Sequence, residues 1–452
     1  MYSRVTLTSH IMIPKAEIEN ISALRDQYTV VSRYKNGPTI SYYKETENYF
    51  GVPRHAVRLS KSLAETIIDK RAKGVPIDLV FKQELWDYQQ KAINEFSTLL
   101  IKGATGFFLE AAPGSGKTVM GLKMLECINR TTLVVVPKTD LLKQWKERIL
   151  QFTNISEDDI GFVENGKANY KGKKIVIGLI HSIVLDRIST PAFCNFFGVV
   201  LFDECDSSLP PTTFSAATGL FPAKFRIGMT GTSQRADGLH VVFESHLAQY
   251  KILCNNTNTM DPRVIVHKFK ESSGSLPSYL KDLSRRGVLI SKLTDNAIRN
   301  NLIANYIIRS FNSGRSTLVI SDRKEQLKKI KQILIKLHKI DSKYIGFYVR
   351  SLDGRMLKQE EKDKTASKSP IILATYGLLG RGTDIPRLET LIFASPRGDA
   401  RQVLGRIERA MEGKKQPVVI DIVDTFYPEC IRSYKTRLKY YESRGLRIKE
   451  LK

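Results

Sequence analysis

The sequence predicts an α/β protein with two parallel-sheet domains in tandem, preceded by a small α+β module. Short apolar runs rich in Val and Ile recur along the chain, separated by helix-length segments, and this rhythm is typical of buried parallel strands with crossover helices. The runs form two sets with a turn-rich stretch between them. The length of 452 residues, 42% of them hydrophobic, suits two to four domains that each have a core.

Each set of apolar runs predicts one α/β unit. The first set comprises FFLEA (107–111), TLVVVP (132–137), KIVIGLI (174–180), GVVLFDE (198–204) and FRIGMTGT (225–232). The second comprises STLVISD (316–322), KYIGFYV (343–349), PIILAT (370–375), TLIFASP (390–396) and PVVIDIV (417–423). Turn formers in NNTNTMDP (255–262) place the boundary, so we expect a first domain over 81–254 and a second over 255–452. In the second, residues 279–314 predict one or two amphipathic helices, and the basic tail 432–452 predicts another.

The first 80 residues predict a separate accessory domain. Strand-like pieces (SRVTLT, TVVSRY, PTISYY) precede a helix-like SKSLAETIIDKRAKG. Aromatic and basic side chains in this module could bind duplex DNA by combining ring stacking with phosphate contacts. These side chains are Tyr34, Tyr42, Tyr43, Tyr49, Phe50, Arg54 and Arg58. The alternative is that the rings form the small core of the module.

The net charge of +25 indicates a polyanionic partner, and nucleic acid is the first expectation. The charge is uneven: residues 1–80 carry +4, residues 81–250 carry +1, and residues 251–452 carry +20. A merely basic, solvated surface is the alternative.

The sequence has no run of 18 or more apolar residues, and its N-terminus lacks the apolar segment of a secretory signal. We therefore expect a soluble protein of the cytoplasm, with no membrane partner. Its five cysteines are scattered without a CxxC pair or a Cys/His cluster, a pattern that predicts reduced thiols and neither a zinc site nor a disulfide framework.

A phosphate-binding loop is predicted at AAPGSGKT (111–118), between a strand-like run and a helix-like VMGLKMLECI. Gly114 and Gly116 let backbone N–H groups point at phosphate oxygens, and the following helix N-terminus adds its dipole. Lys117 is expected to reach the β- and γ-phosphates, and the Thr118 hydroxyl to ligate Mg²⁺. Pro113 and Ser115 complete the nucleotide-binding loop. A glycine-rich turn without nucleotide is the alternative.

DECD (203–206) follows the apolar strand GVVLF, where a parallel sheet places its ligand-binding residues. Asp203 is the predicted Mg²⁺ ligand, and Glu204 the residue that orients or deprotonates the attacking water. Together with the loop, these residues predict ATP hydrolysis.

With these motifs in place, nearly all of residues 81–452 resembles the superfamily 2 helicases. AAPGSGKT corresponds to motif I of that family and DECD to motif II. The remaining motifs are an adenine-recognising ELWDYQQKAI (84–93) with Gln89 as the adenine contact, motif Ia VVVPKTDLLKQW (134–145), motif III MTGTSQR (229–235), motif IV TLVISDRKEQL (317–327), motif V ATYGLLGRGTDIP (374–386) and motif VI QVLGRIERA (402–410).

The resemblance implies two RecA-like domains and a set of roles. Arg406 and Arg409 correspond to arginine fingers that stabilise charge on the γ-phosphate in the transition state. Gly382 and Asp384 are expected to contact nucleotide. The residues that couple nucleotide state to domain movement are Asp206, Thr230, Thr232 and Gln402.

The same resemblance suggests nucleic-acid contacts at Lys138 in motif Ia, Ser321 and Arg323 in motif IV, and Thr375 in motif V. Contacts of this kind reach phosphate and sugar, which carry no sequence information. For each residue the alternative is a solvated or capping role.

The motif forms LWDYQ and PKTDLLKQW, without a DEAD or DEAH box, favour the DNA-directed branch of the family. That branch includes XPB-type helicases and phage branch-migration helicases of the UvsW kind, which share a D-x-x-x-R-N segment similar to TDNAIRNNLI (294–303). The expected protein is an ATP-dependent DNA helicase or translocase of viral or phage type. It would unwind or branch-migrate single-stranded, forked or branched DNA in replication, recombination or repair. The alternatives are an RNA-directed helicase, a duplex translocase that does not separate strands, and an ATP-regulated nucleic-acid clamp.

Overall fold

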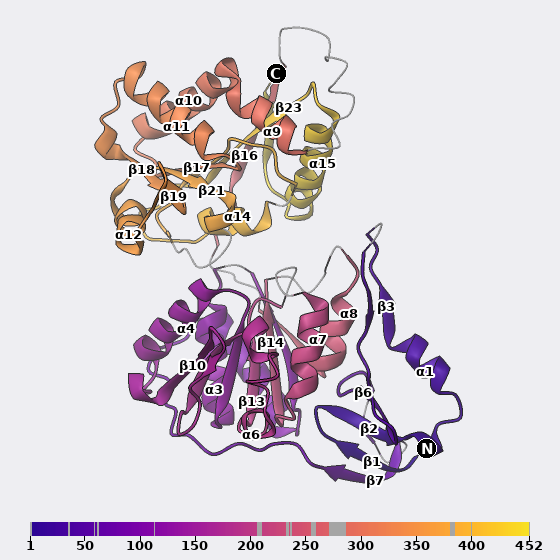
Figure 1. Ribbon diagram of the computed structural model, residues 1–452. Coiled ribbons are helices and arrows are strands. Elements are labelled where there is room, and N and C mark those ends of the chain that lie inside the picture. The colour runs from indigo at the N-terminus through magenta and orange to yellow at the C-terminus, as the bar shows by residue number, and fades with distance from the viewer. Residues whose placement is uncertain are drawn as a thin grey trace. The chain divides into compact units, whose positions relative to one another are not determined.

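The computed structural model describes residues 2–34, 37–57, 59–60, 63–112, 114–205, 210–231, 235, 237–254, 259–270, 286–379, 385–398 and 400–451. The chain divides into two compact units, Met1–Thr257 and Asn258–Lys452. Each unit is built on its own parallel sheet with helices around it, and the first also contains the N-terminal module (Figure 1). The fold is therefore α/β, with two RecA-like parallel-sheet units in tandem and a small N-terminal sheet domain.

The first unit contains an eight-stranded sheet in the order β11-β10-β12-β9-β13-β14-β8-β15, in which the β10–β11 pair is antiparallel and the other neighbours are parallel. Its strands are β8 (Gly106–Ala111), β9 (Thr132–Val136), β10 (Ile160–Glu164), β11 (Lys167–Ala168), β12 (Ile175–Leu179), β13 (Val199–Phe202), β14 (Phe225–Thr230) and β15 (Tyr250–Cys254). All five apolar runs predicted here are strands, namely β8, β9, β12, β13 and β14. The patterns of β10 and β15 were too weak to be predicted.

Helices cover both faces of this sheet. They are α2 (Asp87–Ile101), α3 (Lys117–Ile128), α4 (Thr139–Phe152), α5 (Ile180–Ile183), α6 (Pro191–Cys194), α7 (Pro211–Leu220) and α8 (His240–Leu247), with a 3-10 turn at Glu157–Asp159. Successive residues of β13 point to opposite faces, so Leu201 packs in the core under α2, α3 and α4 and Phe202 packs in the core under α7 and α8. Burial on both faces explains why the strands read as continuous apolar runs.

The N-terminal module is a five-stranded sheet in the order β5-β6-β2-β1-β7, with a separate β3–β4 hairpin. Its elements are β1 (Tyr2–Leu7), β2 (His10–Pro14), a 3-10 turn at Lys15–Glu17, α1 (Ile21–Gln27), β3 (Thr29–Val31), β4 (Thr39–Ser41), β5 (Lys44–Glu45), β6 (Tyr49–Pro53) and β7 (Ala64–Asp69). The predicted helix over SKSLAETIIDKRAKG is wrong, because its centre is β7, paired parallel to β1. The apolar side chains of the module share one core with α7 and α8 of the first sheet.

The second unit is a seven-stranded, all-parallel sheet in the order β18-β21-β17-β22-β23-β16-β24. Its strands are β16 (Arg263–Phe269), β17 (Thr317–Ser321), β18 (Ile345–Tyr348), β21 (Ile371–Thr375), β22 (Thr390–Phe393), β23 (Val418–Asp424) and β24 (Ile448–Leu451), and a short hairpin joins β19 (Ser351–Leu352) to β20 (Arg355–Met356). The five runs predicted in this unit are all strands. The end of the basic tail, expected to be helical, is instead β24, which pairs with β16.

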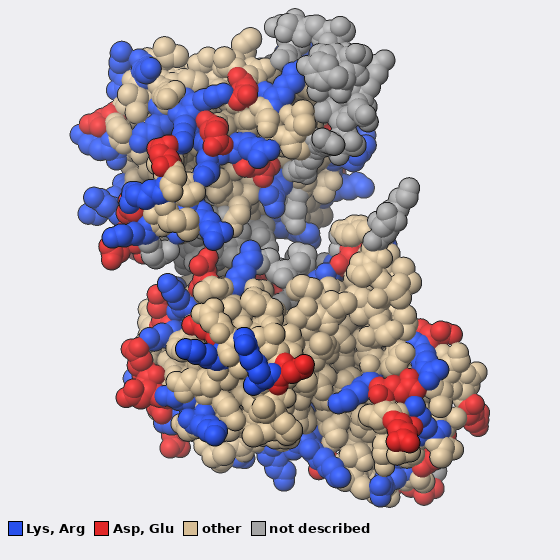
Figure 2. Space-filling model, in the orientation of Figure 1, with Lys and Arg blue, Asp and Glu red and all other residues tan. Residues whose placement is uncertain are grey.

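The helices of the second unit are α9 (Arg286–Asp295), α10 (Ala297–Asn312), α11 (Lys324–Lys336), α12 (Gln359–Lys368), α13 (Tyr376–Leu379), α14 (Arg401–Ile407) and α15 (Pro428–Ser443), with a 3-10 turn at Ser342–Tyr344. The amphipathic stretch predicted over 279–314 is thus two helices. Asn296 separates them, since its side chain accepts a bond from the Arg299 N–H and caps α10. Lys and Arg side chains are spread over the visible face of this unit (Figure 2). Among the helices of the described residues, none is long and apolar enough to cross a membrane.

Candidate active site

The predicted phosphate loop connects β8 to α3, and its backbone requires glycine at two positions. Gly114 and Gly116 have φ angles of 87° and 82°, in the left-handed region that L side chains rarely adopt. A Cβ atom on Gly116 would lie 2.4 Å from Nε2 of Gln89. The loop is therefore closed on one side by a buried side chain. The predicted contact at Pro113 lies outside the described residues.

Two features of this loop fit a phosphate group. The Ser115 hydroxyl oxygen is buried and has no hydrogen-bond partner among the described residues. The α3 helix begins at Lys117, so its first N–H groups and the positive end of its dipole face the loop. Lys117 and Thr118 are half-buried, and the Lys117 ammonium lies 3.5 Å from the carbonyl oxygen of Ala111. An anion at this place would meet a hydroxyl, backbone donors and an ammonium group.

Gln89, the predicted adenine contact, binds the loop in this structure. It is 4% exposed, and its amide nitrogen donates to the Ser115 carbonyl at 2.8 Å. Its amide oxygen accepts from the Trp86 N–H at 3.1 Å, and the Tyr88 hydroxyl donates to the same Ser115 carbonyl at 3.1 Å. Helix α2 thus holds the loop through two side chains. Contact of Gln89 with adenine stays a prediction.

Asp203 and Glu204 directly follow β13. Asp203 is 4% exposed, and its carboxylate accepts from the Trp145 indole N–H at 2.8 Å and from the Glu204 N–H at 2.9 Å. Burial, followed by the nearby charge of Glu204, raises the pKa of Asp203 to about 7, while the Lys117 ammonium opposes that rise. Glu204 itself adopts a left-handed backbone, with φ of 55°. A buried carboxylate next to a half-buried one is a donor set that a divalent cation would neutralise.

Trp145 was not singled out from the sequence as a site residue. It lies on α4, 58 residues before Asp203, and its ring is fully buried. The sequence did contain one signal that could have identified Trp145: it lies on the apolar face of a helix, and a buried indole N–H needs a hydrogen-bond acceptor.

Strand register brings the ends of four strands together. Because β8, β14, β13 and β9 are adjacent and parallel, their carboxyl ends meet at one edge of the sheet. Thr230 pairs with Glu110 of β8 and is fully buried, while Phe202 pairs with Gly228 of β14. The loop, the acid pair and Thr230 are therefore neighbours. The predicted coupling residues Asp206 and Thr232 lie outside the described residues.

Motif VI lies on α14 and the segment after it. Arg406 is 9% exposed on α14, and Arg409 follows the helix in a bridge with Thr259. Gly382 and Asp384 lie outside the described residues, as does the side chain of Gln402.

The predicted nucleic-acid contacts differ in their exposure. Lys138, before α4, and Arg323, before α11, are exposed, and Thr375 at the end of β21 is half-buried. Ser321 is fully buried: its hydroxyl donates to Gln326 at 2.6 Å and accepts from the Arg323 N–H at 3.0 Å. Ser321 therefore closes a turn just before α11, whose N-cap residue is Arg323, and it is neither the solvated nor the capping residue given as the alternative to a nucleic-acid contact.

The D-x-x-x-R-N segment is structural in this fold. Arg299 is fully buried and donates to both carboxylate oxygens of Asp424, at 2.7 and 3.0 Å. The Asn300 side chain donates to the Thr294 carbonyl at 2.9 Å and accepts from Gln326 at 3.0 Å. These bonds join α10 to the end of β23, through Asp424, and to α11 within motif IV, through Gln326.

The N-terminal residues considered for DNA binding differ in exposure. Tyr34 is 59% exposed and Tyr43 and Tyr49 are half-buried, so for these three DNA contact stays a prediction. Tyr42, Phe50 and Arg54 are 4%, 0% and 1% exposed, so the prediction that these three contact DNA is wrong. The rings of Tyr42 and Phe50 belong to the core instead, which was the alternative. Arg54 donates to the carbonyls of Ala223 and Lys224, at 2.6 and 3.1 Å, beyond the end of α7. Burial is the main cause that lowers its pKa well below the usual range. Arg58 lies outside the described residues.

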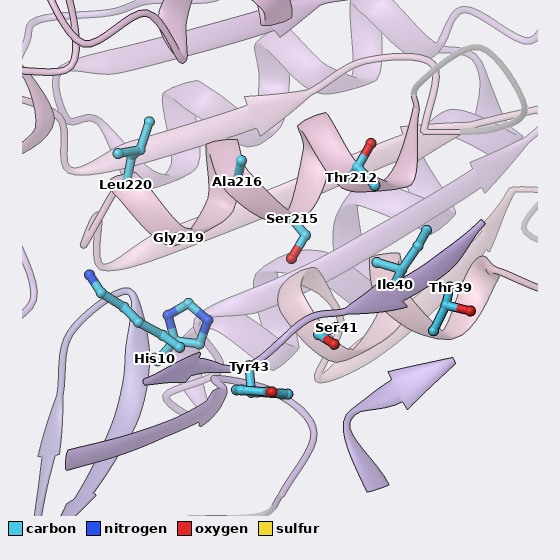
Figure 3. Close-up of a pocket in the computed structure, with 11 residues that line it drawn as sticks. His10, Thr39, Ile40, Ser41, Tyr43, Thr212, Ser215, Ala216, Gly219 and Leu220 are labelled. Atoms are coloured by element: carbon cyan, nitrogen blue, oxygen red, sulfur yellow. The ribbon is translucent and has the colours of Figure 1, made fainter. Parts of the chain in front are cut away.

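A groove of about 410 Å³ separates the module from α7. Figure 3 shows Thr212 and Ser215 of α7 along one side, with Tyr43, Ser41 and His10 of the module along the other. Its lining is mostly hydroxyl and apolar, and Lys44 is the one charged lining residue among those described. Tyr43, one of the side chains considered for DNA binding, lines this groove, whereas no residue predicted for the ATP site does.

Sequence comparison places known families on both units. Residues 82–235 match the family described as "Type III restriction enzyme, res subunit", and residues 298–413 match "Helicase conserved C-terminal domain". The "Putative ATP-dependent RNA helicase L396" of Acanthamoeba polyphaga mimivirus is 26% identical over 452 residues, covering 96% of this chain and 83% of that protein. The "DNA 3'-5' translocase XPB2" of Sulfurisphaera tokodaii is 25% identical over 421 residues, covering 84% and 89%.

Structural comparison supports the same fold. Dbp5 of S. cerevisiae, solved with RNA and ADP BeF3, superposes with a TM-score of 0.53 at 14% identity, covering 82% of this chain and 90% of that one. The expected arrangement of tandem RecA-like domains is thereby confirmed.

Proposed function

Because the chain is a member of the superfamily 2 helicases, we propose that it hydrolyses ATP to move along DNA and to unwind or branch-migrate forked or branched DNA. The observation that carries this proposal is the buried Asp203 carboxylate, with the half-buried Glu204 next to it, at the sheet edge that also bears the phosphate loop. Such a pair beside Lys117 suits hydrolysis of a phosphoanhydride and has no use in a passive binding module.

The residues of the loop and of the acid pair would each have a distinct chemical role. Lys117 would bind the terminal phosphates, and backbone N–H groups at Gly114, Ser115 and Gly116 would hold their oxygens. Mg²⁺, when bound, would neutralise phosphate charge, with Thr118 and Asp203 as the residues that fit it. Glu204 would orient the attacking water and accept its proton.

Arg406 and Arg409 would stabilise the charge that develops on the transferred phosphoryl group. Gly382 and Asp384 would contact the nucleotide as well. Four residues would transmit nucleotide state, namely Asp206, Thr230, Thr232 and Gln402. Lys138, Arg323 and Thr375 would contact the nucleic-acid backbone, and Ser321 would act through Arg323, whose N–H it binds.

We further propose three functional domains, over 1–80, 81–254 and 255–452. Strand β7 and the shared core support an N-terminal domain fixed to the first motor domain.

DNA is the proposed substrate because XPB2, similar over most of this chain, is named as a DNA translocase. RNA is the second candidate, because the mimivirus relative carries the name of an RNA helicase. A role in repair, recombination or replication follows only from the DNA candidate.

One experiment separates these substrates. ATP hydrolysis and strand separation are measured side by side on single-stranded DNA, blunt duplex, forks, four-way junctions and RNA of the same sequence. We expect the largest stimulation on forks or junctions. Stimulation by RNA alone would overturn the DNA assignment, and hydrolysis on duplex without strand separation would identify a duplex translocase.

A further inference from the structure

Lys414 lies in the connection between α14 and β23, and its ammonium group is held by backbone alone. Nζ donates to the carbonyl oxygens of Pro386 at 2.8 Å, Ile407 at 2.9 Å and Arg409 at 2.7 Å. An ammonium group has three donors, so these three bonds use all of them. The residue is 9% exposed, which is unusual for a lysine whose partners among the described residues are backbone carbonyls.

The three carbonyls belong to the two segments that bear motifs V and VI. Ile407 is the last residue of α14, and Arg409 follows it by two residues. Carbonyls at a helix C-terminus lack intrahelical partners and carry partial negative charge, so a cation there is favourable. Pro386 is the last residue of the motif V sequence. One side chain therefore ties the end of motif V to the backbone of motif VI.

We propose that Lys414 is a positioning residue for ATP hydrolysis, which holds the backbone at Arg409 and the end of α14 against Pro386 and so sets the direction of the Arg409 guanidinium. The inference rests on the proposed role of Arg409 as an arginine finger. Lys414 lies outside the recognised motifs. It would act on the reaction indirectly, through the backbone carbonyls that it binds. A misdirected finger lowers the rate of the chemical step more than it lowers ATP affinity.

The adjacent lysine supplies a matched control. Lys415 is exposed, and its ammonium donates at 2.6 Å to the carbonyl of Ser313, the C-cap residue of α10. Lys415→Met therefore removes the same charge and the same side chain one residue away, without touching the bonds of Lys414.

The test is a double-mutant cycle on the full-length chain. Lys414→Met, Arg409→Ala and the double variant are compared by nucleic-acid-stimulated kcat and by KM for ATP, with Lys415→Met alongside. We expect Lys414→Met to lower kcat about 10- to 100-fold with KM nearly unchanged, and the double variant to be no slower than Arg409→Ala. Additive losses, or wild-type kcat in Lys414→Met, would overturn the inference.

The outcomes also separate this inference from the proposed function. If Arg409→Ala hydrolyses ATP at the wild-type rate, the arginine-finger assignment fails. If Arg409→Ala is inactive and Lys414→Met is not impaired, only the role of Lys414 fails.

A second measurement covers the case in which Lys414→Met does not fold. Burial lowers the pKa of Lys414 to about 8, with Glu389 acting against that shift and Arg409 adding to it. Loss of the proton above that pH leaves two donors for three carbonyls, so wild-type kcat should fall as pH rises from 7.5 to 9. Lys414→Arg keeps its charge, and its kcat should stay level over the same range. A wild-type profile that is flat, or one that Lys414→Arg shares, contradicts the inference.

Discussion

At the end of β13 in the first unit, the Asp203 carboxylate is buried, with an indole and a backbone amide among its donors. Along β23 in the second unit, Asp421 and Asp424 are equally buried, and each binds two nitrogens of a buried arginine, Arg437 and Arg299. Both regions contain buried carboxylates at or near the end of a parallel strand. They differ in the cation that neutralises them.

The difference indicates which region is structural and which is reserved for a ligand. A bidentate arginine satisfies the carboxylate completely, so the pairs of the second unit hold its strands and helices together. Asp203 has Lys117 near it and Glu204 beside it, a combination in which burial and like charge raise its pKa to about 7. A carboxylate kept in that condition suits a site that receives a cation and a phosphate group.

The largest effect is expected at the phosphate loop. Lys117→Ala should reduce ATP hydrolysis by at least about 1,000-fold while DNA affinity stays within a few-fold, because the ammonium group is proposed to bind phosphate of ATP and not DNA. Steady-state ATPase and fluorescence anisotropy measure the two quantities. Lys143→Ala, on the exposed side of α4, is the control. Retained DNA-stimulated turnover would refute the site assignment.

Asp203→Asn should separate activity from stability. We expect ATP hydrolysis to fall about 100-fold or more, because the amide replaces an anionic ligand. The free energy of unfolding at neutral pH should change by no more than about 1 kcal/mol, because removal of a buried charge without an arginine partner offsets the loss of one acceptor. The amide oxygen still accepts from Trp145, but the amide NH2 cannot accept from the Glu204 N–H. Urea unfolding followed by fluorescence measures this free energy, and a clear loss of stability would show that Asp203 is a structural residue.

Asp424→Asn should behave in the opposite way. Removing this carboxylate leaves the Arg299 guanidinium buried with its charge uncompensated, so the free energy of unfolding of the second unit should fall by about 3–5 kcal/mol. Urea unfolding is again the measurement. Asp353→Asn, which removes an exposed ion pair with Lys328, should change stability little. Equal effects of the two substitutions would remove the distinction between buried and exposed pairs.

The smallest effect is expected on nucleic-acid affinity. Arg323→Ala, in the strongly basic unit, should weaken DNA binding a few-fold and lower the slope of log affinity against log salt by about 1. Lys138→Ala, in the nearly neutral unit, should do the same if both units contact the backbone. A change with only one of the two substitutions would assign the nucleic-acid path to that unit.

Most of the fold was predictable because its signals are local. All ten predicted apolar runs are strands, since strands buried on both faces need a continuous apolar sequence. The loop glycines were predictable for the same reason, because a left-handed backbone restricts the residue at its own position. The helix expected over residues 60–74 failed because pairing with β1 decides the conformation of β7, and that partner lies about sixty residues away in the sequence.

The sequence by itself determined the class of the protein: the strand rhythm, the ordered motifs, the residues of the phosphate loop and the uneven charge, all of which are properties of short segments. Only the tertiary structure decided how individual side chains are used. In the folded chain Trp145 donates to Asp203, and the buried Ser321 hydroxyl donates to Gln326. Arg54 is buried against the carbonyls of Ala223 and Lys224, and the Lys414 ammonium donates to three carbonyl oxygens. The reason is physical: burial and pairing are joint properties of segments distant in the chain, and no local pattern records which distant group a side chain will meet.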